Sequence, residues 1–413
     1  MLCLRTVLFV QTENGSFMMS DDKKHFCSLV IFCKVVDNFG DIGICWRLAQ
    51  QLQHEHDIAV TLWVDDLVSF QRICPAIDVG IKHQQIYGVA VRHWRDQAGT
   101  LCASDVADIV IEFFGCDIPP GYLQAMAGCT PPPVWLNLEG LSAEDWVEGC
   151  HTLPSPHGQL PLTKYFFFPG FTGKTGGLLC ESSLSAQRQQ FQAEVGAVPD
   201  FLAGFGMTPA EIAAFKVSLV CYPHAPVVAL FDAWQRGTMS ITCLVPEGVA
   251  VAAVEAFLGT PVRAGAKRSR GALTVLVLPF VAQPLYDKLL WACDLNFVRG
   301  EDSFVRAQWA CKPFIWHIYP QDKNLHHVKL AAFLQRYAHD LDGISLFSRC
   351  WNDVPVSDPM HLPDWSTLWS LCLAELPKTA LHSAEWQLQM AENGDLSSNL
   401  MQFAGTLREA ARK

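Results

Sequence analysis

Residues 295–319 contain two apolar runs, separated by a polar cluster and a helical pattern. This order predicts a strand, a tight loop, a helix and a second strand. Open α/β sheets hold their ligands in loops at the carboxyl ends of strands. The polar cluster, Arg299 to Ser303, would occupy such a loop. This cluster is therefore a candidate ligand-binding site.

The residue types in this cluster favour an anionic ligand. Ser303 or Asp302 is expected to cap the following helix, because its side-chain oxygen can accept the free backbone N–H groups there. Those N–H groups and the positive end of the helix dipole also suit a phosphate. The alternative is an exposed, solvated turn. Gly300 and the mixed charges together favour a site.

The same alternation recurs from residue 27 onward. Residues 29–36 and 58–64 are expected strands around a helix that presents Ile44, Leu48 and Leu52 on one face, which predicts a βαβ unit in a parallel sheet. Further strands are expected at 107–113, 134–138, 165–168, 216–222, 239–245, 273–280, 295–298 and 314–319. Helices are expected at 227–235, 251–258 and 284–293.

A chain of 413 residues is too long for one ordinary core. The pattern predicts two tandem α/β domains with a cleft between them. We expect an N-terminal extension at 1–26, domains at 27–180 and 213–390, a connection at 181–212, and a closing helix within 391–413.

Composition excludes several classes of protein. The formal net charge of −11 argues against a direct nucleic-acid partner, whereas an acidic cleft would attract a cation. Sixteen scattered cysteines without metal-type spacing indicate free thiols in a reducing compartment. No apolar run approaches the roughly 20 residues that span a bilayer, and the N-terminus has no convincing cleavage site. We therefore expect a cytoplasmic protein without a membrane partner.

A second candidate site lies in the loop after the first strand. Asp37 and Asp41 flank a turn that opens a helix, and Gly40 lets the backbone approach a ligand closely. A carboxylate here could act as a base or orient a cation. The alternative is a helix cap and an ordinary turn. The spacing does not match G-x-G-x-x-G, so a nicotinamide site is not expected.

Four other motifs indicate a function less strongly. Gly173-Lys174-Thr175 imitates the end of a P-loop but lacks its first glycine, so we expect a connector. Asp340-Leu341-Asp342 follows a helical stretch and is expected to be a turn rather than a metal site. His317, His326 and His327 are expected to be structural or surface residues. Phe280 and Gln283 could stack on and read a nucleobase, although core packing of Phe280 is equally plausible.

Several long segments together resemble one family. They are IFCKVVDNFGDIGICWRLA (31–49), LPSP (153–156), KYFFFPGF with TGGL, LPFVAQ, RGEDSFVRAQ and KPFIWHIYPQ. From about residue 27 to the C-terminus the chain resembles the bacterial protein-arginine rhamnosyltransferases that modify translation elongation factor P.

The resemblance implies a GT-B architecture, with two Rossmann-like domains facing across a cleft. It implies transfer of L-rhamnose from dTDP-β-L-rhamnose to an arginine of elongation factor P, with inversion and without a metal or other cofactor. The modified factor would then rescue polyproline-stalled ribosomes. The C-terminal domain would hold the nucleotide sugar, and the N-terminal domain would meet the protein acceptor.

The resemblance also implies roles for single residues. Asp41 would be the catalytic carboxylate, Asp37 a second essential acid, and Glu301 would hold the rhamnose or diphosphate end of the donor. The other donor-binding residues would be Gly40, Tyr222, Phe280, Gln283, Arg299, Asp302, Ser303 and Tyr319. Val220 is a departure, because some relatives have an aromatic residue there.

A guanidinium is a poor nucleophile because its pKa exceeds about 12. Asp41 would therefore orient it and accept its proton, while Arg299 and the helix that begins near Ser303 would meet the charge of the leaving dTDP. Two alternatives are a transferase of the same architecture with a small-molecule acceptor and a non-catalytic partner of the translation machinery. The intact acidic residues argue against the latter.

Overall fold

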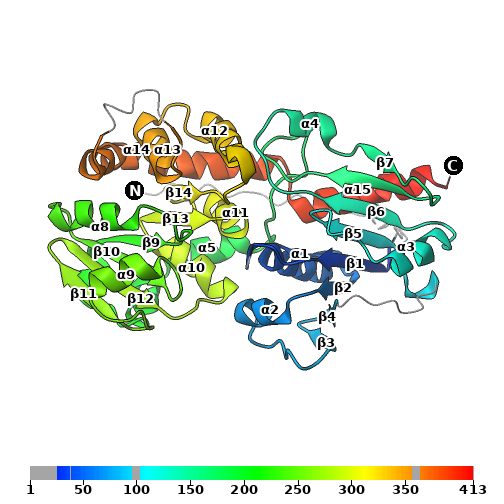
Figure 1. Cartoon of the computed structure of the whole chain (residues 1–413), viewed down its shortest axis with the longest axis horizontal. Helices are drawn as coiled ribbons and strands as arrows, with labels where there is room; N and C mark the ends of the chain where they lie inside the picture. The colour runs from blue at the N-terminus through cyan, green and yellow to red at the C-terminus, as the bar shows by residue number, and fades with distance from the viewer. Residues whose placement is uncertain (1–25, 38, 95–102, 356–362, 413) are drawn as a thin grey trace, which may run out of the picture.

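The computed structural model describes residues 26–37, 39–94, 103–355 and 363–412. They form two α/β units that lie side by side (Figure 1). The two-domain α/β architecture expected from the sequence is confirmed. The expected N-terminal extension lies outside the described residues, apart from Phe26, which is buried in the core of the first unit.

The N-terminal unit is built on an eight-stranded sheet with the order β3-β4-β2-β1-β5-β6-β8-β7. Its strands are β1 (Ser28–Cys33), β2 (Ala59–Val64), β3 (His83–Ile86), β4 (Val89–His93), β5 (Ile109–Phe113), β6 (Val134–Leu138), β7 (Pro154–Pro156) and β8 (Thr163–Phe167). Its helices are α1 (Gly40–His56), α2 (Leu67–Ile73), α3 (Pro120–Ala127) and α4 (Trp146–Cys150). The strands pair in parallel except at the two edges, where β3 and β7 are antiparallel to their neighbours.

The C-terminal unit has a six-stranded sheet with the order β11-β12-β10-β9-β13-β14. Its strands are β9 (Phe215–Leu219), β10 (Ile241–Pro246), β11 (Lys267–Arg270), β12 (Leu273–Leu278), β13 (Leu295–Arg299) and β14 (Phe314–His317). Its helices are α8 (Val227–Arg236), α9 (Val251–Leu258), α10 (Gln283–Ala292), α11 (Asp302–Trp309), α12 (Leu325–Tyr337) and α13 (Asp342–Trp351). The short helices α5 (Leu184–Ala193), α6 (Ala197–Ala203) and α7 (Pro209–Ala213) connect the two sheets.

Most of the predicted strands lie in the interior of the two sheets. Several of them, such as β5, β6 and β10, are buried along their whole length. Strands covered on both faces are continuous apolar runs, which a sequence reveals directly. The edge strands β3, β7 and β11 were not predicted, because they are short and largely polar or proline-containing and lie partly in solvent. The internal strand β4, which is short and only partly buried, was not predicted either.

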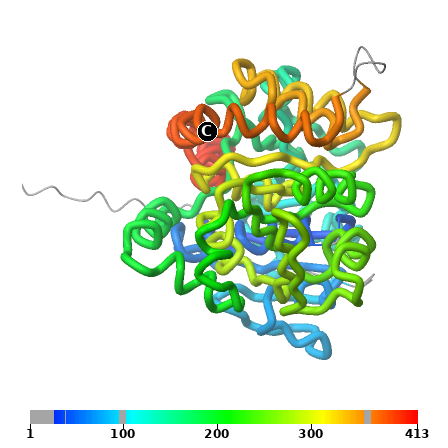
Figure 2. Tube along the Cα trace, turned by 90° about the vertical axis from the view of Figure 1, so that its left-hand side faces the viewer, coloured from blue at the N-terminus to red at the C-terminus, as the bar shows by residue number. Residues whose placement is uncertain are grey.

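The end of the chain joins the two units. Helix α14 (Trp365–Glu392) packs on the C-terminal unit, and α15 (Leu396–Ala410) lies on the N-terminal unit (Figure 1, orange and red). The end view in Figure 2 shows these helices gathered at the top of the molecule. Phe403 of α15 packs on Tyr165 and Phe167, which confirms the predicted closing helix.

Charged side chains hold the two units together at their junction. Arg47 of α1 reaches Asp287 of α10 (Nη1 to Oδ2, 3.2 Å) and Asp302 of α11 (Nε to Oδ1, 3.0 Å). Arg306 of α11 binds the same Asp287 (Nη2 to Oδ2, 2.8 Å) and also Glu181 (Nη1 to Oε2, 2.5 Å). We call these five residues the junction network. Both arginines and Asp287 are buried, so the network is stable only while every charge is paired.

A glycine lets α1 approach the C-terminal unit closely. A Cβ at Gly43 would lie 3.2 Å from both Asp302 Oδ2 and Gln283 Nε2. The Gln283 amide also donates to the Gly43 carbonyl (3.0 Å). The first two turns of α1 are therefore fixed against the ends of α10 and α11.

Replacing Arg47 by alanine should lower the free energy of unfolding by about 3–5 kcal/mol, because it leaves buried carboxylates short of a cation. The matched control is Lys174→Ala, which removes an exposed ion pair with Glu148 (3.1 Å) and should cost far less, because solvent screens exposed charges. Urea denaturation measures both. Equal losses in the two variants would contradict the structural role of the junction network.

Candidate active site

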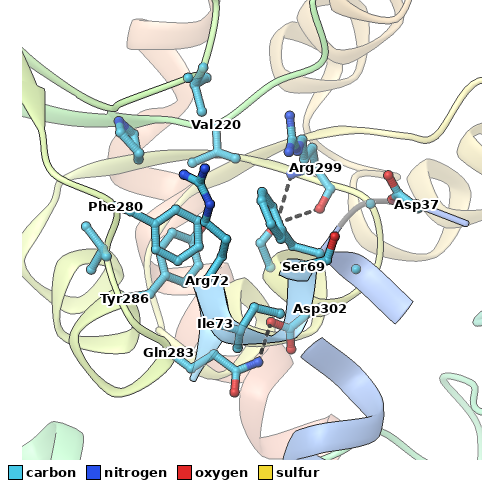
Figure 3. A pocket seen from close by; sticks show the side chains of 18 of the residues that line it. Asp37, Ser69, Arg72, Ile73, Val220, Phe280, Gln283, Tyr286, Arg299 and Asp302 are labelled. Carbon is cyan, nitrogen blue, oxygen red and sulfur yellow. Dashed lines mark hydrogen bonds between the residues drawn. The ribbon is translucent and has the colours of Figure 1, made fainter. Parts of the chain in front are cut away.

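Two cavities lie between the units. The first, of about 500 Å³, is shown in Figure 3. It is lined by Asp37, Phe39, Gly40, Val68, Ser69, Arg72 and Ile73 from the N-terminal unit and by Val220, Pro246, Glu247, Gly248, Val249, Phe280, Val281, Gln283, Tyr286, Arg299, Gly300, Asp302 and Ser303 from the C-terminal unit. The second, of about 340 Å³, is lined by Val36, Asp37, Gly40, Asp41, Ile44, Phe114, Glu139, Gly140, Gly300, Glu301, Tyr319, Gln321 and Lys329.

One end of the first cavity is apolar and aromatic. Phe280 is 37% exposed, and its ring packs edge-on against Phe39 with the centroids 5.3 Å apart. Val220 and Tyr286 complete this end. A partly exposed aromatic face in a cleft suits a flat ring, as in the predicted stacking of a nucleobase.

The polar end of the first cavity is built on the loop after β13. Arg299 donates from Nη1 to the Cys221 carbonyl (3.0 Å), and its guanidinium lies 5.1 Å from the centre of the Tyr222 ring. Gly300 has φ +58°, and a Cβ there would lie 2.9 Å from Asp37 Oδ2. Glycine therefore permits both the turn and the close contact between the units.

The expected helix cap is wrong. Helix α11 begins at Asp302, and the residue at the cap position, Glu301, makes no capping hydrogen bond with its side chain. The Ser303 hydroxyl donates to the Arg299 carbonyl and accepts from the Arg299 amide, while the Asp302 carboxylate is held by Arg47. The N-terminal N–H groups of α11 thus have no side-chain cap. Gly300, Asp302 and Ser303 at this end of the helix line the first cavity, so an anion could bind there.

Tyr222 connects this wall to the N-terminal unit. Its hydroxyl donates to Asp37 Oδ2 (2.8 Å), and its backbone N–H donates to His317 Nδ1 (3.1 Å). Burial and the Asp37 charge raise the pKa of the Tyr222 hydroxyl, so the group remains a donor. His317 is buried, in agreement with the structural role expected for it.

The second cavity is acidic. Asp41 is 4% exposed, and its Oδ2 accepts the backbone N–H groups of Val36 (2.7 Å) and Asp37 (2.9 Å). Burial raises the pKa of the Asp41 carboxyl in spite of these hydrogen bonds. Glu301 Oε2 accepts from the Leu141 amide (3.0 Å). Burial raises the pKa of Glu301 to about 7, with Asp41 and Asp37 acting in the same direction.

The residues predicted for the site are divided between these cavities. Asp37 and Gly40 line both, Asp41, Glu301 and Tyr319 line the second, and Tyr222 lies behind their common wall. The first cavity is lined by Phe280, Gln283, Arg299, Asp302 and Ser303. Tyr319 therefore lies away from the aromatic end that Phe280 forms.

Other lining residues were missed by sequence reasoning. Glu139 directly follows β6, so its position at the carboxyl end of a predicted strand could have revealed it. Burial raises the pKa of its carboxyl. Lys329 and Arg72 lie on the helices α12 and α2, which had not been predicted. Arg47 lies in a predicted helix, where nothing in the sequence distinguishes it from a solvated arginine.

Two of the weaker motifs lie away from both cavities. Gly173-Lys174-Thr175 is a turn in which Lys174 pairs with Glu148, and Asp340-Leu341-Asp342 joins α12 to α13. Across residues 26–412, with the gaps given above, no group of three His, Cys, Asp or Glu side chains is arranged to hold a metal ion. Within the same residues, every helix is too short or too polar to cross a membrane.

Comparisons with known proteins identify the family. The sequence model of the family "Elongation-Factor P (EF-P) rhamnosyltransferase EarP" matches residues 29–405 of this chain. A protein-arginine rhamnosyltransferase of Pseudomonas putida is 48% identical over 379 residues, which cover 90% of this chain and 97% of the relative. A protein-arginine rhamnosyltransferase of Shewanella oneidensis is 39% identical over 389 residues, covering 90% and 96%.

A solved structure that describes EarP-mediated arginine glycosylation of translation elongation factor EF-P is 34% identical and has a TM-score of 0.62. The match covers 91% of this chain and 98% of that one. The two sheets and the cleft between them are thus those of a GT-B glycosyltransferase. The chain belongs to the EarP family of elongation factor P rhamnosyltransferases.

Proposed function

We propose that this protein transfers L-rhamnose from dTDP-β-L-rhamnose to an arginine of elongation factor P, with inversion at the sugar. The observation that carries the proposal is that two cavities of different chemistry share a wall. Asp37, Gly40 and Gly300 line both cavities, whereas Phe39, Phe280 and Tyr286 line only the first and Asp41, Glu139 and Glu301 line only the second. A sugar at the common wall would lie between its nucleotide and an incoming guanidinium.

The first cavity would hold the donor. The thymine ring would stack on Phe280, and Gln283 would lie near its polar edge. The diphosphate would bind Arg299 and the uncapped N-terminus of α11, which supply positive charge without a metal. Asp302 and Ser303 would contribute through their backbone N–H groups, because their side chains already bind Arg47 and Arg299.

The second cavity would hold the acceptor arginine. Asp37, Asp41, Glu139 and Glu301 line it, with Lys329 as a single lysine. Asp41 is the best candidate for the base, since its buried carboxylate has a raised pKa and a fixed orientation. It would orient the guanidinium and accept a proton as the new C–N bond forms and the bond from the sugar to the diphosphate breaks. Glu301 and Tyr319 would contact the rhamnose.

The two units would divide these tasks. We propose that residues 27–180 meet the acceptor protein and that residues 213–390 hold the nucleotide sugar. The connection at 181–212 and the end of the chain at 391–413 would keep them aligned. The reaction would take place in the cytoplasm, where both elongation factor P and nucleotide sugars are found.

Intact-protein mass spectrometry tests the proposal directly. Purified elongation factor P is incubated with this protein and dTDP-L-rhamnose. The expected result is the mass of one added deoxyhexose on one arginine. If the mass stays constant while the donor is shown to bind, elongation factor P is not the acceptor.

Asp41→Asn should lower kcat by a factor of about 10²–10⁴, the usual contribution of a general base. Its amide oxygen can still accept the Val36 and Asp37 amides, so the loop should keep its shape. The dissociation constant for dTDP, measured by calorimetry, should remain within about twofold. Asp232→Asn, an exposed position on α8, is the control and should keep full activity. Retained turnover in Asp41→Asn would rule out its role as the base.

The ionisation of Glu301 should be visible in the pH dependence of kcat/KM for the acceptor. Above pH about 7 the charged carboxylate attracts the guanidinium, and this attraction is lost as the pH falls through the raised pKa of about 7. Glu301→Gln should remove the inflection, whereas Glu194→Gln, an exposed position, should retain it. The same inflection in Glu301→Gln would exclude Glu301 as its source.

A further inference from the structure

Arg72 lines the first cavity from the N-terminal unit, whereas most of the proposed donor-binding residues belong to the C-terminal unit. It lies in the last turn of α2, and Asp66 caps the first turn of this helix by accepting from the Val68 and Ser69 amides. Arg72 and Ser69 both line the first cavity. In Figure 3 the Arg72 side chain extends into the cavity toward the end formed by Val220 and Phe280.

The Arg72 guanidinium is exposed and has no role in holding the fold together. It makes no hydrogen bond or ion pair with any of the residues that the structure describes. By contrast, the two arginines of the junction network are buried and fully paired. Nearby, Glu247 is an exposed carboxylate that lines the same cavity. Arg72 is therefore free to bind a ligand.

The partly exposed Phe280 ring offers an aromatic face to a base. A thymine stacked on Phe280 would have a second face, and on that side the C-terminal unit supplies Val220, an aliphatic side chain that is too small to cover a ring. A guanidinium is planar and weakly hydrated, and it stacks on flat rings, which a lysine ammonium cannot do.

We infer that Arg72 stacks its guanidinium on the face of the nucleobase opposite Phe280. The inference rests on the proposed function, because it requires a thymidine nucleotide in the first cavity. It adds a specificity-determining residue from the N-terminal unit. The donor would then contact both units, so its binding would hold the cleft closed over the sugar.

Calorimetric titration with dTDP and with inorganic diphosphate tests this role. Arg72→Ala should raise the dissociation constant for dTDP about 5-fold to 30-fold, the expected effect of losing one stacking cation. Binding of inorganic diphosphate should change less than about twofold. Arg72→Lys keeps the charge but not the planar group, so it should behave like Arg72→Ala. Arg263→Ala, an exposed arginine that does not line the cavity, is the matched control.

A second-site variant tests stacking independently of charge. Val220→Phe in the Arg72→Ala background should recover at least part of the lost dTDP affinity, because an aromatic ring then covers the same face of the base. In turnover assays, Arg72→Ala should raise the KM for the donor, and saturating donor should restore kcat to within about twofold. A purely structural role would not give this rescue.

The outcomes separate this inference from the proposed function. If the wild-type protein binds dTDP and Arg72→Ala binds it equally well, the stacking role is overturned and the donor assignment remains. If Arg72→Lys retains wild-type affinity, or if both nucleotide and diphosphate binding fall together, Arg72 acts through its charge and stacking is again overturned. If the wild-type protein does not bind dTDP, the proposed donor is wrong and the inference fails with it.

Discussion

The pairing of buried charges at the junction network determines how the two units face each other. Arg47 stands on the same helix as Asp41, so the ion pairs that Arg47 makes with Asp287 and Asp302 also fix the N-terminal end of α1, which carries Asp41. Burial of an unpaired charge would cost several kcal/mol, and any other orientation of α1 would leave one. Gly43 removes the Cβ that would otherwise keep the helix away. The common wall of the two cavities depends on this contact.

The contacts across that wall link the two halves of the site. Tyr222, from the C-terminal unit, donates to Asp37, and Leu141, from the N-terminal unit, donates to Glu301. Each acid is thus held by the opposite unit. Burial raises the pKa values of Asp41 and Glu301, which brings proton acceptance closer to neutral pH. Asp37, Asp41, Glu139 and Glu301 all line the second cavity. The cavity therefore favours a cation such as a guanidinium before any specific hydrogen bond forms.

The path of the chain supports this arrangement. Helix α14 belongs to the C-terminal unit, whereas α15 returns to the N-terminal sheet, where Arg408 pairs with Asp108 (3.2 Å). The units are therefore connected twice, through α5–α7 and through the α14–α15 corner. Asp395 caps α15 through the Ser397 and Ser398 amides and also accepts from the Gln51 amide of α1 (3.1 Å). The second connection thus also contacts the helix that carries Asp41.

The sequence by itself determined the alternation of buried strands and helices, the two sheets, and the strand-to-helix connections at which Asp37, Asp41 and Arg299 lie. These features depend on local periodicity and on the rule that ligands bind at the carboxyl ends of parallel strands. The family resemblance added residue roles that periodicity cannot provide. Only the tertiary structure decided that Ser303 and Asp302 do not cap α11, that Glu139 and Lys329 line the acidic cavity, and that Arg72 faces the opposite unit's aromatic end. The physical reason is that these properties depend on partners far away in the chain. The Asp302 carboxylate forms an ion pair with Arg47, which lies 255 residues earlier in the chain. No local sequence pattern encodes such a pairing.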